Sequence, residues 1–483
     1  MTDGVVCTTE GVGAATSRAN TWRASAVVGA FLLLSIWTYA LDARYLYFSA
    51  YLWFGFIYGA SLQYGRFCMA SAIRDLFAVG VPRMAVGIMI AVVLFSLVSA
   101  AVTVAGKSTF HASPIGLYSV VGGAIFGFGM VFTGGCATGS LYKTGEGSVS
   151  ALLVVISLSF AQALFVDVGG LLDALVPASW TASAAAKSMP AELTVTKGWY
   201  DQFLAGYIWD LKSVTAGDAL GLASPAAKAF IGNSLVNAIL PAIVILAVIY
   251  VRWYRKGWLR KNKGAAPGPA REVAGWWSMV TASKRTAIAG LVLGVAAGLQ
   301  MWVMQTLQQK FGISNAGELL TAMGNTQGLS LQETVFDPGY FYVTTQEAQG
   351  AAWVLAQLGM DLRDNIFFGM ENGIPSPLAN PVLWMSFSVI GGSMVMALLA
   401  NEFKLKMPTR EIAVWAIGGG ILMGIGSRIG MGCNIGAFFA TVTNGDPSGW
   451  LFALGMTAGG YGGVKFFNWW IERKMAKETP LGF

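Results

Sequence analysis

The chain has 483 residues, of which 55% are hydrophobic and only 11% are charged. Soluble domains carry about 25% charged residues, and the mean hydropathy of this chain is +0.60. This composition excludes an ordinary soluble protein and indicates an all-α polytopic membrane protein. The net charge of +7 does not indicate nucleic-acid binding, because lysine and arginine gather in loops beside apolar runs, where they set membrane orientation.

Apolar runs of about 20 residues, the length that crosses ~30 Å of hydrocarbon, recur along the whole chain. We predict about ten transmembrane helices, at residues 24–41, 45–64, 83–106, 115–133, 149–170, 231–251, 286–304, 381–400, 411–428 and 448–468. The first twenty residues are polar and lack a small-residue cleavage pattern. The first run is therefore predicted to be a retained helix or an uncleaved signal anchor.

Charged loops predict the orientation of these helices. The basic stretches predicted to face the cytoplasm are 252–264, 401–410 and 472–477. The loop 308–349 is predicted to lie outside, because it has four acidic residues against Lys310. These acidic residues are Glu318, Glu333, Asp337 and Glu347. With ten helices, both termini are cytoplasmic, and the predicted location is the inner (plasma) membrane of a bacterial-type cell.

Cofactor motifs are absent from the sequence. The chain has four cysteines and one histidine, namely Cys7, Cys68, Cys136, Cys433 and His111. It has no CxxC or HExxH pattern, so a zinc, haem or iron–sulfur site has no ligand set. It also has no GxxxxGK[ST] motif for nucleotide phosphates. We therefore expect no cofactor, no metal site and no ATP hydrolysis.

An internal repeat divides the chain into two halves. A shift of 297 positions superimposes seven residues on identical ones, including one of the few cysteines. The matched pairs are Gly122 and Gly419, Gly123 and Gly420, Gly127 and Gly424, Gly129 and Gly426, Gly135 and Gly432, Cys136 and Cys433, and Gly139 and Gly436. The predicted topology threads the two copies in opposite directions, which makes them inverted, pseudosymmetric repeats. Such repeats place a substrate site near the membrane midplane.

The repeat predicts a division of the chain into five parts. These parts are an N-terminal tail with an extra helix (1–44), a first repeat (45–175), a linking region (176–285), a second repeat with an insertion at about 301–360 (286–470) and a cytoplasmic tail (471–483). The linking region comprises an extracytoplasmic loop, a helix and a basic cytoplasmic loop. The insertion falls where the second repeat would hold a counterpart of Cys68.

Each copy contains a glycine-rich stretch, at 122–143 and 419–440, predicted to enter the membrane, break at its cysteine and restart as a short helix. Backbone outside a helix survives at membrane depth only when it is buried in protein or faces a water-filled cavity. A restarted helix directs its free N–H groups and positive dipole end toward the break, which suits an anion. Glycines before each cysteine are assigned to close packing. Those that bracket the thiols are assigned to the site: Gly135, Gly139, Gly432 and Gly436.

Three thiols and two arginines complete the candidate path. Free cysteine is usually a small buried hydrophobe, but Cys68, Cys136 and Cys433 all lie at predicted breaks. A protonated thiol is a weak S–H donor and a soft contact, so it can pass on an anion with a terminal sulfur without trapping it. Arg66 and Arg428 are predicted to attract anions at opposite mouths, or else to pair with carboxylates or snorkel to headgroups. Asn434, next to Cys433, is included in the path.

Three stretches resemble the YeeE/YedE-like sulfur-transport family, whose characterised members take up thiosulfate. They are LQYGRFCMASAIRD (62–75), FTGGCATGSLYKTGEG (132–147) and SRIGMGCNIGAFFATVTNGDPSGW (427–450). The resemblance implies two inverted halves, an hourglass shape and a relay of thiosulfate by S–H hydrogen bonds between Cys68, Cys136 and Cys433. The resemblance is compatible with a small cytoplasmic sulfur-carrier protein as a partner, in addition to membrane lipid. It is also compatible with selenium or persulfide compounds as substrates.

Two other functions remain open from the sequence. One is a membrane thiol enzyme that forms a persulfide or disulfide on Cys136 or Cys433, which the repeat would bring together. The other is a passive channel for a small neutral solute, with the cysteines as packing. Uptake of thiosulfate or a related sulfur anion, without enzyme activity, is the first hypothesis.

Overall fold

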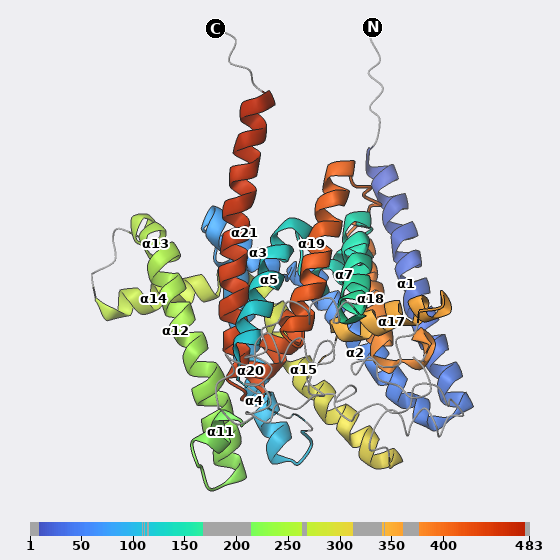
Figure 1. Ribbon diagram of the computed structural model, residues 1–483, viewed down its shortest axis with the longest axis horizontal. Helices are drawn as coiled ribbons and strands as arrows, with labels where there is room; N and C mark the ends of the chain where they lie inside the picture. Colours follow the sequence, from blue (N-terminus) through green and yellow to red (C-terminus); the bar gives the residue numbers. More distant parts are fainter. Residues whose placement is uncertain are drawn as a thin grey trace, which may run out of the picture.

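The computed structural model describes residues 9–108, 110, 112–113, 115–167, 214–262, 268–312, 341, 343–360 and 376–478. Within these residues the protein is built of helices, and no β-strand occurs among them. Figure 1 shows long helices packed side by side into a bundle. Cys7, His111 and most of the predicted loop 176–228 lie outside the described residues.

Each of the ten predicted spans coincides with a helical segment. Nine are α1 (Thr9–Leu41), α2 (Leu46–Gly65), α4 (Arg83–Val104), α5 (Leu117–Thr133), α7 (Val149–Asp167), α15 (Lys284–Phe311), α18 (Pro381–Leu399), α19 (Arg410–Ile429) and α21 (Ser448–Glu478), and the tenth runs from Ala227 to Lys261 and includes α12 (Leu240–Ile249). Seven described segments are long and apolar enough to cross a membrane; α2, α7 and α21 are helical but are not among these seven. The chain is therefore a multi-pass helical membrane protein.

Repeat-related glycines pack against repeat-related partners. A Cβ atom at Gly123 on α5 would collide with the carbonyl oxygen of Phe452 on α21. Its counterpart Gly420 on α19 lies against α7, where a Cβ atom would be 3.0 Å from the carbonyl oxygen of Val154. Glycine thus lets α5 approach α21 and lets α19 approach α7 at backbone distance. The assignment of these glycines to close packing is confirmed.

Helices from the two halves also contact each other in antiparallel pairs, one of which, α5 and α19, is related by the repeat. On α5 and α19, Gly122 lies against Gly426 and Gly430, whereas Gly129 lies against Gly419. On α2 and α15, Tyr58 donates to Gln300 at 2.6 Å, and Gln308 donates to Tyr47 at 3.1 Å. In both pairs, residue numbers rise along one helix in the direction in which they fall along its neighbour. Two oppositely threaded copies would make this pattern.

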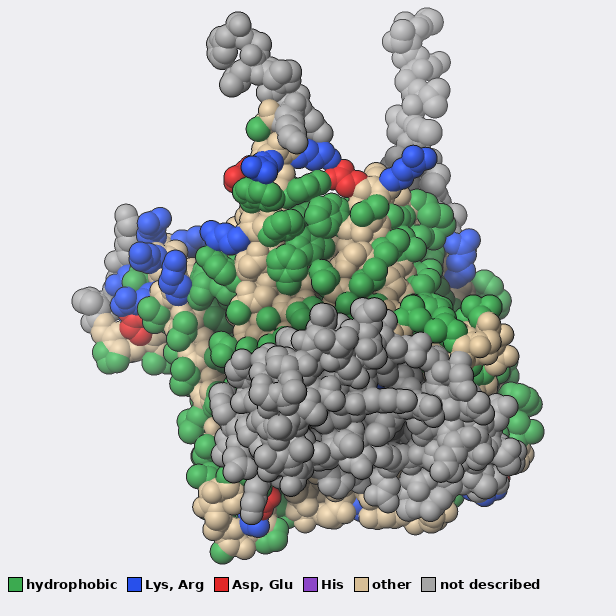
Figure 2. Space-filling model, viewed as in Figure 1, with side chains coloured by type: hydrophobic (Ala, Val, Ile, Leu, Met, Phe, Trp, Pro, Cys, Tyr) green, Lys and Arg blue, Asp and Glu red, His purple; other side chains and the backbone are tan. Residues whose placement is uncertain are grey.

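The exterior has the character expected of a protein surrounded by lipid. Figure 2 shows hydrophobic side chains over much of the described surface, with lysine and arginine gathered where α1 begins and α21 ends, and around α13 (Arg255–Lys261). Large apolar side chains are exposed on the outer helices, among them Leu33, Val244 and Leu454. The beginning of α1 and the end of α21 lie on the same side of the bundle (Figure 1), as an even number of crossings requires.

The prediction of a loop at 308–349 is wrong at its two ends, which are helical, whereas residues 313–340 and 342 lie outside the described residues. Helix α15 continues to Phe311, and the chain forms a further helix, α17 (Val343–Gln357), which packs against α7 and α18. Glu347 on α17 is only 6% exposed. The acidic residue that was expected in an outside loop therefore lies inside the protein.

Candidate functional site

The three cysteines share one local structure. Each is the N-cap residue of a short helix: Cys68 of α3 (Met69–Arg74), Cys136 of α6 (Ala137–Gly145) and Cys433 of η9 (Asn434–Ala440). Two residues before each cysteine the backbone is left-handed, at Arg66 (φ 49°), Gly134 (φ 65°) and Met431 (φ 56°). This turn ends one helix and redirects the chain into the next. The predicted break at each cysteine is confirmed.

Left-handed backbone at Arg66 and Met431 is a sign of constraint. A residue with a Cβ atom pays about 1–3 kcal/mol for such a conformation, so the surrounding packing must hold it in place. The related Cys136 (φ −78°, ψ −178°) and Cys433 (φ −85°, ψ −176°) have nearly the same backbone angles. Both halves therefore fix their thiols in the same way.

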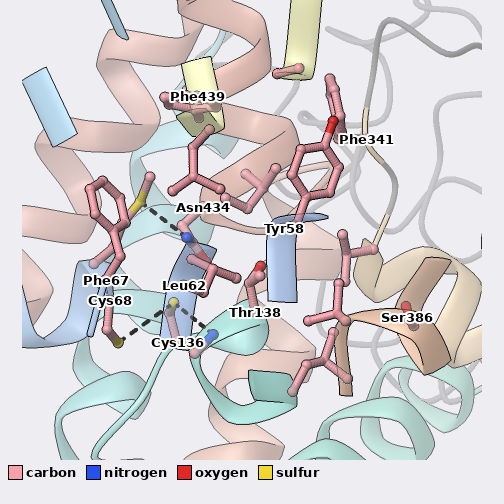
Figure 3. Close-up of a pocket in the computed structure, with 18 of the residues that line it drawn as sticks. Tyr58, Leu62, Phe67, Cys68, Cys136, Thr138, Phe341, Ser386, Asn434 and Phe439 are labelled. Atoms are coloured by element: carbon pink, nitrogen blue, oxygen red, sulfur yellow. Dashed lines mark hydrogen bonds between the residues drawn. The ribbon is translucent and has the colours of Figure 1, made fainter. Parts of the chain in front are cut away.

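A cavity of about 70 Å³ lies where these helices meet (Figure 3). Since one water needs roughly 10–15 Å³ by the same measure, this cavity has room for a small polyatomic ion. Its polar or sulfur-bearing lining includes Cys68, Cys136, Thr138, Asn434 and Ser386. The rest of the lining is mostly apolar or aromatic, and both repeats contribute to it.

Two thiols lie together at this cavity. The Sγ atoms of Cys68 and Cys136 are 3.9 Å apart, within S–H···S hydrogen-bond range, and the residues are 1% and 2% exposed. The backbone N–H of Gly139 donates to Cys136 Sγ at 3.3 Å. A Cβ atom at Gly139 would lie 2.7 Å from Cys68 Sγ and 3.2 Å from Cys136 Sγ. Gly139 therefore provides the space that both sulfur atoms occupy.

The cavity also presents polar atoms that the protein itself does not use. Within the described part of the chain, Thr138 Oγ1 and Asn434 Oδ1 have no hydrogen-bond partner. The amide nitrogen Nδ2 of Asn434 donates to Met69 Sδ at 3.0 Å. A buried polar group without a partner is costly, so these atoms favour a ligand or water in the cavity. The prediction from sequence missed Thr138 and Ser386.

Cys433 lies beside this cavity rather than in its wall. The next two residues, Asn434 and Ile435, line the cavity, and the N–H of Ile435 donates to Cys433 Sγ at 3.4 Å. The Cys433 side chain is 1% exposed and has Thr344 and Glu347 of α17 as neighbours. The structure thus brings Cys68 and Cys136 together, whereas Cys433 directly precedes two residues of the cavity wall.

The other bracketing glycines shape the backbone around the thiols. Gly432 has a φ of +149°, a conformation that favours glycine. A Cβ atom at Gly135 would lie 3.3 Å from Ser140 Oγ, which is tighter than an ordinary contact. Gly436 lines a separate cavity of about 20 Å³ with Tyr118 and Met431.

Arg66 lies at one end of the site, where charges of both signs gather. Its side chain is 56% exposed and forms a 2.8 Å ion pair with Glu402, to which Gln63 also donates at 3.3 Å. Burial raises the pKa of the nearby Glu146 carboxyl, whereas Lys406 and Arg66 act in the opposite direction. This cluster joins the end of α2 to the loop after α18.

Arg428 differs from the expectation of an arginine at an open mouth. It lies on α19 and is 1% exposed, the largest of the fully buried side chains. A long side chain in the last turn of a helix reaches water only if the neighbouring helices leave it uncovered, and here they enclose it. No group of three or more histidine, cysteine, aspartate or glutamate side chains able to hold a metal occurs among the described residues.

Comparison with known proteins adds to this geometry. The thiosulfate transporter TsuA of Spirochaeta thermophila is 27% identical over 413 residues, which cover 83% of this chain and 93% of the relative. The TsuA of Escherichia coli is 36% identical over 111 residues, or 23% of this chain and 32% of that protein. The probable transporter YedE of Escherichia coli is 35% identical over 130 residues, or 26% and 32%.

A family model described as sulphur transport matches residues 64–462, a range that contains all three buried cysteines and both repeats' glycine-rich stretches. The chain therefore belongs to the sulphur transport family.

Proposed function

We propose that this protein takes up thiosulfate or a related inorganic sulfur anion and passes it along a path formed by Cys68, Cys136 and Cys433. The observation that carries the proposal is the pair of thiols, 3.9 Å apart, in the wall of the cavity of about 70 Å³. Two relatives named as thiosulfate transporters support the choice of substrate. In this proposal the protein is a transporter and not an enzyme.

The cavity chemistry suits an anion that must be released again. A protonated thiol donates weakly through S–H, and its sulfur is a soft contact for a terminal sulfur atom. The start of α6 adds the positive end of a helix dipole. Lysine side chains at the same place would bind an anion more tightly and slow its release. Asn434 and the bracketing glycines belong to the same path in this proposal.

The wider arrangement is part of the proposal as well. We infer a first repeat at 45–175, a second at 286–470, an hourglass outline, cytoplasmic termini and a location in the inner membrane. The antiparallel packing of α5 on α19 supports the inverted repeats. The basic α13 supports a cytoplasmic position for the loop after α12. A small cytoplasmic sulfur-carrier protein is a candidate partner.

Cysteine replacement tests the proposal. We expect Cys68→Ser, Cys136→Ser and Cys433→Ser each to lower uptake by about tenfold, since each alters a contact that the moving anion uses. The measurement is growth of a cell that needs external thiosulfate for cysteine synthesis, together with uptake of labelled thiosulfate into proteoliposomes. Cys7→Ser is the matched control. Full uptake after removal of any two path cysteines rejects the relay.

The closeness of Cys68 and Cys136 also favours one alternative, a thiol enzyme that forms a persulfide or disulfide. Mass spectrometry of the protein after exposure to thiosulfate separates the two. A stoichiometric sulfur adduct on a cysteine, with no labelled anion inside the vesicles, favours the enzyme. Unmodified thiols with net uptake favour the transporter. Competition by thiosulfate or selenite, but not by sulfate, excludes a passive channel for neutral solutes.

Arg66 provides a test of anion capture. We expect Arg66→Gln to raise the KM for thiosulfate by about 2–10-fold at low ionic strength, because an exposed charge steers anions over a distance that salt screens. Salt should reduce the difference from the unmodified protein. Arg74→Gln is the matched control, since Arg74 is 44% exposed and paired with the adjacent Asp75 at 3.0 Å. An effect of equal size at both positions would contradict a specific role for Arg66.

A further inference from the structure

Glu347 is a buried carboxyl group with few partners. It lies on α17 and is 6% exposed. Its Oε1 accepts one long hydrogen bond, 3.4 Å, from Ser386 Oγ on α18. Within the described part of the chain, its Oε2 has no hydrogen-bond partner. Most buried carboxylates in proteins are ion-paired or accept several hydrogen bonds, so this group is an exception that needs an explanation.

Among the described residues, the elements packed most extensively on α17 offer Glu347 no cation. They are α6, α7, α18 and η8 (Pro377–Ala379). In their described side chains, α7, α18 and η8 contain no charged residue. Helix α6 contributes Tyr142 and Lys143, and the Lys143 ammonium donates to the carbonyl of Gly134. Among the described residues, the Cys433 thiol is a titratable group close enough to interact electrostatically with Glu347. Because burial of an uncompensated charge is costly, Glu347 is most stable when it holds a proton.

Glu347 is also one side chain away from the anion path. Ser386, its hydrogen-bond donor, lines the cavity that contains Cys68 and Cys136. Cys433, the third thiol, is also close enough to Glu347 to interact with it electrostatically. A change in the charge at Glu347 is therefore felt at both parts of the path, in an interior that screens charge poorly.

We propose that Glu347 is the proton-binding site that couples uptake of the sulfur anion to entry of a proton. This inference rests on the proposed function. Thiosulfate carries two negative charges, and a membrane potential that is negative inside opposes its entry in proportion to the charge moved. A proton carried with each dianion halves that charge. The proton binds the carboxylate while the path is open to the outside and leaves to the cytoplasm with the anion.

The protonation state of Glu347 then controls occupancy of the path. With the proton bound, an anion next to Ser386 and Cys433 meets a neutral carboxyl group. Without the proton, the carboxylate repels a second negative charge at close range in a low-dielectric interior. Binding of the proton therefore strengthens binding of the anion, and binding of the anion strengthens binding of the proton. This mutual effect is the condition for coupling two ions in one transport cycle.

The test uses the full-length protein in proteoliposomes with the membrane potential clamped at zero and labelled thiosulfate at equal concentration on both sides. An outside pH one unit below the inside is a tenfold ratio of proton activity, so coupling of one proton per anion drives accumulation that approaches about tenfold. We expect Glu347→Gln to accumulate none, and Glu347→Asp to recover part of the effect. Glu411→Gln, which changes an exposed carboxylate paired with Lys474, should accumulate as the unmodified protein does.

Each outcome has a separate meaning. In a second arm, thiosulfate is added only outside the vesicles. Uptake by the unmodified protein in this arm, without accumulation in response to the pH gradient in the first, overturns the coupling but leaves the proposed function intact. Absence of any thiosulfate uptake overturns the proposed function itself. Accumulation that persists in Glu347→Gln shows that the proton binds elsewhere. If Glu347→Gln fails to fold, a trapped pH dye is used to follow acidification of the vesicle interior when thiosulfate is added. The measurement is made with the unmodified protein and with Glu347→Asp. No acidification with either protein overturns the proposal.

Discussion

Replacement of Gly139 by alanine is expected to block uptake while the fold is retained. The new Cβ atom would lie 2.7 Å from Cys68 Sγ and 3.2 Å from Cys136 Sγ, whereas non-bonded heavy atoms prefer about 3.5–4.0 Å. Both thiols must then move, and the cavity that they line changes shape. Overpacking of this kind costs about 1–3 kcal/mol, which corresponds to a fall in uptake rate of roughly 5–150-fold if it acts on the path.

Stability should be affected less than transport. Gly139 lies within helix α6, where alanine has a better helix propensity than glycine by about 1 kcal/mol, which offsets part of the strain. The measurements are labelled thiosulfate uptake and thermal unfolding in detergent. Gly418→Ala is the matched control, because no heavy atom lies within 4 Å of the position of its Cβ atom on α19. Normal uptake by Gly139→Ala would mean that the anion does not pass these thiols.

Alanine at Gly127 and at its repeat counterpart Gly424 is expected to destabilise the folded protein at both sites. The Cβ atom at Gly127 would collide with the carbonyl oxygen of Met456 on α21, and that at Gly424 would lie 2.6 Å from the carbonyl oxygen of Leu158 on α7. Backbone atoms of a packed helix cannot turn aside as a flexible side chain does. We expect a loss of roughly 1–3 kcal/mol in each variant.

The measurement is thermal unfolding of each purified variant, with the amount of folded protein recovered from membranes as a second readout. Gly462→Ala on α21 serves as the control, since open space surrounds its Cβ position. Two variants with similar losses would agree with equivalent packing in both halves. Destabilisation by Gly127→Ala alone would contradict the two-fold equivalence of the α5–α21 and α19–α7 contacts.

Much of this fold could be predicted from the sequence because it is encoded locally. A run of about 20 apolar residues must form a helix in lipid, where every backbone polar group needs an internal partner, and each predicted run is helical. The breaks at Cys68, Cys136 and Cys433 follow from glycine and turn residues just before them. The glycines that repeat at a spacing of 297 positions mark contacts at backbone distance, since a side chain there would keep the helices apart.

Which thiols meet was decided by the tertiary structure. The repeat suggested that Cys136 and Cys433 would be brought together, but Cys68 is the thiol that lies 3.9 Å from Cys136. Sequence symmetry relates two positions without fixing the distance between them. That distance depends on how α2, α5 and α19 cross. The enclosure of Arg428 has the same origin, because it depends on which helices cover the end of α19.

The position of α17 is the clearest case in which sequence alone was insufficient. Its first turns are polar, so its composition indicated a loop in water. Inside the protein, distant residues satisfy part of this polarity: Asn380 donates to Gln346 at 2.6 Å and to Gln349 at 2.8 Å. The sequence by itself therefore determined a helical membrane protein with repeated breaks at cysteines. Only the tertiary structure buried Glu347 beside the third thiol, because partners far along the chain make burial of a polar helix possible.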